Sequence, residues 1–293
     1  MTGQPERPAG TPGSLEPGPG EAPPPLLPSA LDATVVLLRH GESQWITEGR
    51  FQGQGDSPLS DLGRRQAALA AERLAHPHRP PALPIPAGPP VAIHHSPLGR
   101  TTETAAMVVE AMAAPDGFGS RPIVVPDPGF LEIGQGEWEG LPGATIVERW
   151  SAVLDGWRRD PLSAWAPGGE SLPEVDGRVR AALERTFGEL EAVAPAGRRQ
   201  ESHVLGYADL VGDQPWALIV GHDGVFKVTL LALLDLPLTR FWTFPFALCG
   251  ITVVEIRGGR SRLRTHNATD HLASLEDEAA RRREAERRAS GAL

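Results

Sequence analysis

The sequence has little cysteine and little basic charge. Cys249 is the single cysteine among 293 residues, which excludes an intrachain disulfide and any metal site built on several cysteines. Lysine and arginine number 28 against 37 aspartate and glutamate residues, so the formal net charge is -9. This charge disfavours binding to nucleic acid or to anionic membranes, because both depend on many Lys and Arg contacts. A single cysteine fits a reducing compartment, and we expect a cytoplasmic protein.

A long hydrophobic run is also missing. No stretch approaches the roughly 18 apolar residues of a membrane-spanning helix, and the N-terminus has no basic segment followed by an apolar run. We therefore expect no membrane span and no export signal. Hydrophobic residues make up 40% and charged residues 22% of the chain, a balance typical of globular proteins that dissolve in water.

Proline and glycine are concentrated in particular stretches. Residues 1–32 are rich in both and have hardly any aliphatic periodicity, which predicts a disordered tail because little surface could be buried to offset ordering entropy. Residues 33–272 contain the regular patterns and predict one domain. Within it, residues 195–215 predict a polar insertion. Residues 273–293 are dense in Glu and Arg at helical spacing, which predicts a solvated charged helix or tail.

Short apolar runs alternate with helical patterns along this domain. Runs typical of strands buried on both faces occupy residues 34–38, 91–93 and 217–220. A helical pattern follows each run, over residues 61–75, 101–114 and 225–234. The alternation predicts a three-layer α/β/α sandwich with a mostly parallel central sheet.

Two further patterns extend this fold. Ser171 and Glu174 form a capping box, which predicts a helix from there to about residue 194. Residues 251–256 and 262–265 are separated by two glycines and predict a closing pair of strands.

Polar residues suited to phosphate follow three of the predicted strands. Arg39 and His40 end the first strand, Arg100 follows the second, and His222 follows the third. Ligands of open parallel sheets bind at the carboxyl ends of the strands, so we expect these side chains to meet. Guanidinium groups hold phosphate oxygens, an imidazole can act as nucleophile, and a carboxylic acid can protonate a leaving alcohol. The small Gly41 is interpreted as allowing an anion to approach the backbone.

Four motifs follow one another at these strand ends and in the loops between them. They are Arg39-His40-Gly41-Glu42-Ser43 with Asp56-Ser57-Pro58-Leu59-Ser60; Ser96-Pro97-Leu98-Gly99-Arg100-Thr101; Leu131-Glu132 with Gly136-Glu137-Trp138-Glu139-Gly140; and Gly221-His222. In this order and spacing they resemble the histidine phosphatase superfamily, in its phosphoglycerate mutase-like branch, from about residue 34 to residue 272. The resemblance implies an enzyme that needs no metal ion and no other cofactor.

The resemblance also implies a role for each matching residue. His40 would be the nucleophile that is transiently phosphorylated, and Arg39, Arg100 and His222 would complete the phosphate pocket. Glu132 would donate a proton to the leaving group. Further contacts with substrate are expected from four residues: Ser43, Gln52, Gly53 and Asp223.

Ile46 departs from the family pattern. Relatives commonly have at this position an Asn that helps to hold the phosphate. Unless Thr47 or Gln52 substitutes for it, we expect the pocket to lack one polar contact.

Two residues after the last motif also depart from the pattern. Asp223 follows His222 as in the acid-bearing motif of the family's other branch, so it is a rival of Glu132 for the role of general acid. Lys227 stands where relatives often have Arg, and we interpret it as a helix-face lysine with a solvated head.

The predicted function is hydrolysis of a small phosphorylated metabolite. Glu132 is followed by Ile133-Gly134-Gln135-Gly136-Glu137-Trp138, the form found in phosphatase members, where mutases have an Arg-His-Tyr-Gly stretch. A phosphoglycerate mutase is the first alternative. A catalytically weak relative that binds phosphorylated ligands or partner proteins is the second, and Ile46 and Asp223 keep it open. The sequence does not define the substrate, and a homodimer is plausible from family habit alone.

Overall fold

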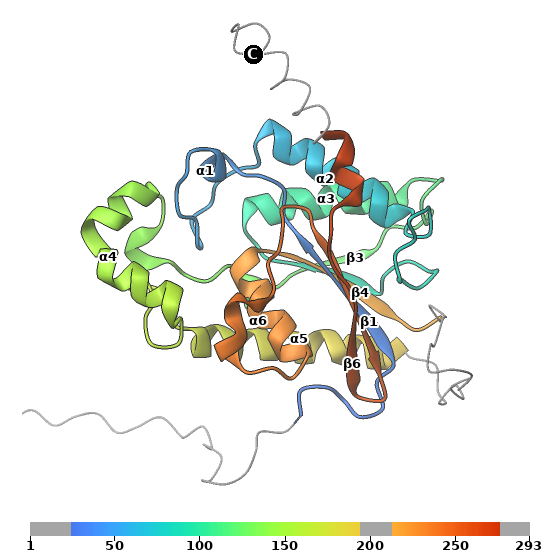
Figure 1. Cartoon of the computed structure of the whole chain (residues 1–293). Helices are drawn as coiled ribbons and strands as arrows, with labels where there is room; N and C mark the ends of the chain where they lie inside the picture. The colour runs from blue at the N-terminus through green and yellow to red at the C-terminus, as the bar shows by residue number, and fades with distance from the viewer. Residues whose placement is uncertain (1–24, 194–212, 276–293) are drawn as a thin grey trace, which may run out of the picture.

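The fold is centred on one six-stranded sheet. A computed structural model describes residues 25–193 and 213–275, and Figure 1 shows their arrangement. Most of the predicted N-terminal tail, nearly all of the predicted insertion and most of the charged C-terminal segment lie outside the described residues. Within the described part of the chain, no helix is long and apolar enough to cross a membrane.

The strand order in the sheet is β3-β2-β4-β1-β5-β6. The first four of these strands pair in parallel, and β5 and β6 are antiparallel, so the expected mostly parallel sheet is confirmed. The strands are β1 (Ala33–Arg39), β2 (Ala92–His95), β3 (Ile123–Pro126), β4 (Trp216–Gly221), β5 (Ile251–Arg257) and β6 (Arg260–Ala268).

Helices cover both faces of the sheet, because β1 and β4 are apolar on both sides. Val36 and Leu38 of β1 pack with α2 (Asp61–Ala75) and α3 (Gly99–Ala113). Val35 and Leu37 point the other way and pack with α5 (Leu172–Val193) and α6 (Asp223–Leu233). The two apolar clusters confirm the three-layer α/β/α sandwich.

Two elements were not expected from the sequence. Strand β3 has only four residues at the sheet edge, and Ile123 is 67% exposed, so it lacks the buried apolar pattern of the other strands. Helix α4 (Gly143–Arg159) starts after Pro142 without a side-chain cap and is kinked at Trp150, which weakens its helical signature. This helix lies at the periphery of the molecule, away from the sheet (Figure 1).

Short elements complete the chain. They are α1 (Gln44–Thr47) and the 3-10 helices η1 (Pro128–Phe130), η2 (Gly136–Trp138), η3 (Leu238–Thr243) and η4 (Asp270–Leu272). Residues 25–32, which the sequence assigns to the tail, contact the domain. Leu31 is buried in the core, and Leu26 and Leu27 pack against it.

Candidate active site

A cavity opens at the carboxyl end of β1. Its volume is about 230 Å³, and its wall combines charged residues with aromatic ones. The wall residues are Arg39, His40, Arg50, Phe51, Gln52, Gly53, Arg100, Glu132, Ile133, Gln135, Trp157, Asp223, Gly224, Lys227, Phe241 and Trp242. The structure therefore brings together most of the residues that the sequence motifs singled out.

His40 is held with one ring nitrogen free. Its Nδ1 lies 2.6 Å from the carbonyl oxygen of Gly41, which can only accept, so Nδ1 carries the proton and donates it. Burial, together with the charges of Arg100 and Arg39, lowers the pKa of His40 well below its usual value. The neutral ring therefore presents the lone pair of Nε2, which is the form a nucleophile needs.

His222 is fully buried beside His40, with its ring edge-on at a centroid distance of 5.0 Å. Arg100 Nε donates to its Nδ1 at 3.3 Å, so the proton of the neutral ring lies on Nε2, 2.8 Å from Ser96 Oγ. Burial and the charge of Arg100 lower the pKa of His222 well below its usual value. His222 contacts the nucleophile but is not part of the cavity wall.

Two arginines give the cavity its positive charge. Arg100 is completely buried, and its terminal nitrogens donate to the carbonyls of Gly53 and Gly55 at 2.8 Å each. Arg39 donates from Nη1 to the carbonyl of Phe246, while its buried Nε has no partner within the described chain. An anion that entered the cavity would satisfy this donor.

Glu132 lies at the N-terminus of α6. Its carboxylate accepts hydrogen bonds from the backbone amides of Ile133, Gly224 and Val225 at 2.9, 3.1 and 2.9 Å. Helix N-termini orient carboxylates in this way because the first amides of a helix have no partner inside it. Glu132 is thus fixed by the loop that contains it and by the helix after His222.

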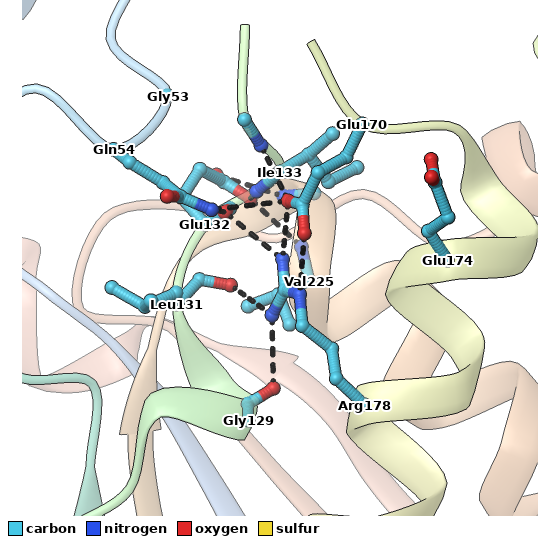
Figure 2. A network of polar contacts seen from close by, with 12 residues as sticks. Gly53, Gln54, Gly129, Leu131, Glu132, Ile133, Glu170, Glu174, Arg178 and Val225 are labelled. Carbon is cyan, nitrogen blue, oxygen red and sulfur yellow. Dashed lines mark hydrogen bonds and ion pairs between the residues drawn. The ribbon is translucent and has the colours of Figure 1, made fainter. Parts of the chain in front are cut away.

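A second carboxylate and an arginine support the backbone of Glu132 (Figure 2). Arg178 of α5 donates to the carbonyls of Gly129, Leu131 and Glu132 at 2.9, 2.8 and 3.0 Å. It also forms an ion pair with Glu170 at 2.8 Å. Glu170 accepts from Gly134 N at 2.7 Å and from the Gln54 side chain at 3.1 Å. Arg178 is therefore the centre of a network that fixes the loop of Glu132.

Sequence reasoning missed this network, although part of its signal was visible. The predicted capping box of Ser171 and Glu174, which directly follows Glu170, is present, with Glu174 accepting from Ser171 N at 2.8 Å. Nothing in the local pattern distinguishes Arg178 from a solvated arginine, because its backbone acceptors lie 46 to 49 residues away along the chain.

Ser43 and Ile46 stand outside the cavity wall. Ser43 is fully buried and caps α1, where its hydroxyl accepts from Ile46 N at 3.4 Å. Ser43 therefore has a backbone partner in the fold, and its contact with substrate stays a prediction. Thr47 does not substitute for the missing Asn, because its hydroxyl donates to the carbonyl of Gln44. Gln52 and Gly53 do line the cavity, as expected.

Lys227 differs from its prediction. Its side chain is 8% exposed and forms an ion pair with Asp223, one turn earlier on α6, so its head is not solvated. The other oxygen of Asp223 accepts from Phe246 N at 3.3 Å. Both residues line the cavity, and the carboxylate of Asp223 is already engaged by a cation.

Gly41 is required for packing against a helix. A methyl group at Gly41 would lie 2.3 Å from the carbonyl oxygen of Gly63 in α2, and one at Gly63 would lie 1.9 Å from that of Glu42. The two backbones touch, so neither position has room for a larger side chain. This contact is a packing reason for Gly41, and the approach of an anion to its backbone stays a prediction.

The comparisons with known proteins agree with this geometry. The sequence profile of the histidine phosphatase superfamily (branch 1) matches residues 35–269, and the chain belongs to this family. Phosphoserine phosphatase 1 of Hydrogenobacter thermophilus is 28% identical over 245 residues, which cover 84% of this chain and 97% of that protein. A probable phosphoglycerate mutase of Salmonella choleraesuis is 37% identical over 153 residues, 51% of this chain and 60% of that protein.

Solved structures give the same result. A mycobacterial glucosyl-3-phosphoglycerate phosphatase in complex with VO3 superimposes with a TM-score of 0.61 at 30% identity, over 80% of this chain and 98% of that one. The alpha-ribazole phosphatase of Shigella flexneri shares the fold, with a TM-score of 0.61 over 80% of this chain and 96% of its own, at 21% identity. Phosphatases of this family are thus similar to the chain over almost their whole length.

Proposed function

We propose that the protein is a metal-independent phosphomonoesterase that acts on a small phosphorylated metabolite through a phosphohistidine at His40. The observation that supports this most is the state of His40: a buried neutral imidazole with a free Nε2, beside two arginines and facing a cavity. This arrangement supplies a nucleophile and charge neutralisation from the chain itself.

The reaction proceeds in two transfers. Nε2 of His40 attacks phosphorus, the ester P–O bond breaks, and Glu132 gives its proton to the leaving alcohol. Water then attacks the phosphohistidine, Glu132 takes a proton from that water, and the P–N bond breaks to release phosphate. Arg39 and Arg100 neutralise the charge on the transferred group in both steps.

Glu132 is the better candidate for general acid. Asp223 is bonded to the buried Lys227 through one carboxylate oxygen and to Phe246 N through the other, whereas the Glu132 carboxylate accepts only from backbone amides among the described residues. Glu132 also lies in the cavity wall, and the network of Arg178 fixes its loop. Asp223 is therefore assigned to the recognition of substrate.

Hydrolysis is preferred to mutase activity. The similarity to phosphoserine phosphatase 1 covers 84% of the chain, whereas the probable phosphoglycerate mutase matches only 51% of it. The stretch after Glu132 also has the phosphatase form. A mutase is the second candidate because that shorter match has the higher identity, 37%.

The test is an assay of an aryl phosphate in excess EDTA with the wild type and His40→Ala, alongside 3-phosphoglycerate. We expect hydrolysis that is insensitive to EDTA, is lost in His40→Ala, and occurs without formation of 2-phosphoglycerate. Rapid acid-free quenching should trap labelled phosphate on the wild type only. Activity that requires a metal ion, or that survives in His40→Ala, would contradict the proposal.

A further inference from the structure

The wall of the cavity contains a buried ion pair. Lys227 is 7% exposed, and its Nζ is bonded to Asp223. The same Nζ lies 5.5 Å from the ring centre of Phe241 and 5.2 Å from that of Trp242. Carboxylate and aromatic faces thus surround the ammonium group, and its charge is compensated before any ligand binds.

Three aromatic rings form the wall beside this pair. Trp157 and Phe241 are buried, with ring centres 5.5 Å apart, and Trp242 packs edge-on against both at 5.7 and 4.8 Å. Trp242 is nevertheless 47% exposed. The packed neighbours hold it in place while leaving ring surface open, as in sites that stack the apolar face of a ligand.

Each cation of the described cavity wall already has a partner within the chain. Arg39 and Arg100 stand beside His40 and match the charge of one phosphate. Arg50 is bonded to Glu48 at 2.6 Å and to the carbonyl of Gly140 at 2.7 Å. Lys227 is neutralised by Asp223, whose side chain keeps 33% of its surface exposed. A carboxylate or second phosphate beside the pair would have to compete with Asp223 for Lys227.

Gln52 favours a ligand that carries a hydrogen-bond donor. Its Oε1 is buried in the cavity region and has no hydrogen-bond partner among the described residues. A buried acceptor of this kind gains most from a ligand that brings an N–H or O–H group. Asp223 has the same preference for donors.

We propose that the Asp223–Lys227 pair selects phosphomonoesters whose leaving alcohol is uncharged, bears hydroxyl groups and has an apolar ring face, that is, sugar phosphates. Hydroxyl groups donate to Asp223 and Gln52, and the ring stacks on Trp242. The pair excludes carboxylated and doubly phosphorylated alcohols. This inference rests on the proposed function, because it assigns the leaving-group end of the same cavity.

The experiment compares a hexose phosphate with 3-phosphoglycerate and phosphoserine, as ratios of kcat/KM. The wild type should prefer the hexose phosphate by at least about tenfold. Asp223→Asn keeps the size of the side chain but leaves the charge of Lys227 uncompensated, so it should shift the ratio toward the carboxylated substrates by about tenfold or more, mainly through KM. The double variant Asp223→Asn with Lys227→Met has no charge at either position and should reverse that shift.

Trp242→Ala separates stacking from charge. It should raise KM for the hexose phosphate about tenfold and have a smaller effect on glycerol phosphate, whose alcohol part is uncharged but has no ring. Thermal unfolding of each variant checks that it folds. A wild type that prefers 3-phosphoglycerate or phosphoserine would overturn the inference, as would an Asp223→Asn variant with an unchanged ratio.

A binding measurement tests the substrate preference without turnover. Calorimetric titration of His40→Ala with the same three compounds should give the same order of affinity. Failure to hydrolyse any phosphate, the aryl phosphate included, would sink the proposed function. Hydrolysis of the aryl phosphate without a preference for the hexose phosphate, in turnover and in binding, would overturn this inference alone.

Discussion

The two ends of the cavity are built differently. At the phosphate end, His40 and Arg100 are buried and are held by carbonyl groups of the backbone. At the leaving-group end, Asp223, Lys227 and Trp242 are held mainly by one another, and Trp242 is half exposed.

This difference suggests that the first group of residues serves catalysis and the second group determines which substrate is preferred. The carbonyl groups of Gly41, Gly53 and Gly55, in the loops after β1, fix these side chains, so the phosphate end is preorganised for one reaction. Side chains of α6 and η3 that touch mainly each other can change without such a disturbance. Substitutions at the first end should affect all substrates alike, and those at the second should change their ranking.

The largest effect is expected from Arg100→Met. The change removes a phosphate ligand and leaves the carbonyls of Gly53 and Gly55 unpaired, so kcat/KM should fall about 10³-fold for every phosphate ester. Steady-state kinetics with an aryl and a sugar phosphate would measure this. Arg64→Met is the control, because Arg64 of α2 forms a surface ion pair with Glu103 of α3 and does not line the cavity. A loss confined to one substrate would break the distinction between the two ends.

Arg178→Met should lower kcat by about 10- to 100-fold for alkyl phosphates. Arg178 is a positioning residue, since it holds the loop of Glu132 and does not line the cavity. An aryl phosphate with an acidic leaving group needs less proton donation and should be affected much less. Arg180→Met, which removes a partly buried pair with Asp176 on the same helix, serves as the control, because Arg180 does not contact the loop of Glu132 in the described hydrogen bonds. Equal losses for both esters would argue against this role.

Gly41→Ala should destabilise the protein by about 1–3 kcal/mol, because the added methyl group would collide with the carbonyl of Gly63. Urea unfolding measures the change. At Gly177 of α5, by contrast, nothing lies within 4 Å of an added methyl group. Gly177→Ala should therefore be neutral or slightly stabilising. Similar results for both glycines would show that the phosphate end is not rigidly packed.

Acid should weaken the fold through the two buried histidines. Their pKa values lie well below the usual 6.5, so the unfolded chain binds more protons than the native one as the pH falls below 6.5. The free energy of unfolding should then fall by up to about 1.4 kcal/mol per pH unit for each histidine.

Urea titrations between pH 7.5 and 5 would measure this slope. His222→Asn should make it shallower than in the wild type, because it removes one of the two buried histidines. A slope in His222→Asn identical to that of the wild type would show that the buried histidines are accessible to protons in the native state.

The sequence predicted the parts of the fold that have periodic burial. Helix α2 begins and ends at the predicted residues, and β1, β4 and β5 differ by one residue at most at each end. Strand β3 was missed because an exposed edge strand has no such pattern. Helix α4 was missed because it is kinked and lacks a cap.

Site residues that directly follow a strand could be predicted from the sequence. Contacts between side chains of elements far apart in the chain could not. His40, Arg39 and Arg100 were placed by the topology rule that strand ends meet. Lys227 was mistaken for a solvated residue, because its burial depends on Phe241 and Trp242, which come from η3. A local sequence pattern contains no information on such contacts.

The strand order also bears on how the protein reaches its native state. Strand β1 lies between β4 and β5, which come late in the chain, and the bonded residues Arg100 and His222 are 122 positions apart. Such non-local pairing is slow, because a long loop must close before any contact stabilises it. During synthesis, the ribosome must release β4 before His40 acquires its neighbours. An N-terminal fragment that ends before β4 would therefore have the nucleophile without its surroundings.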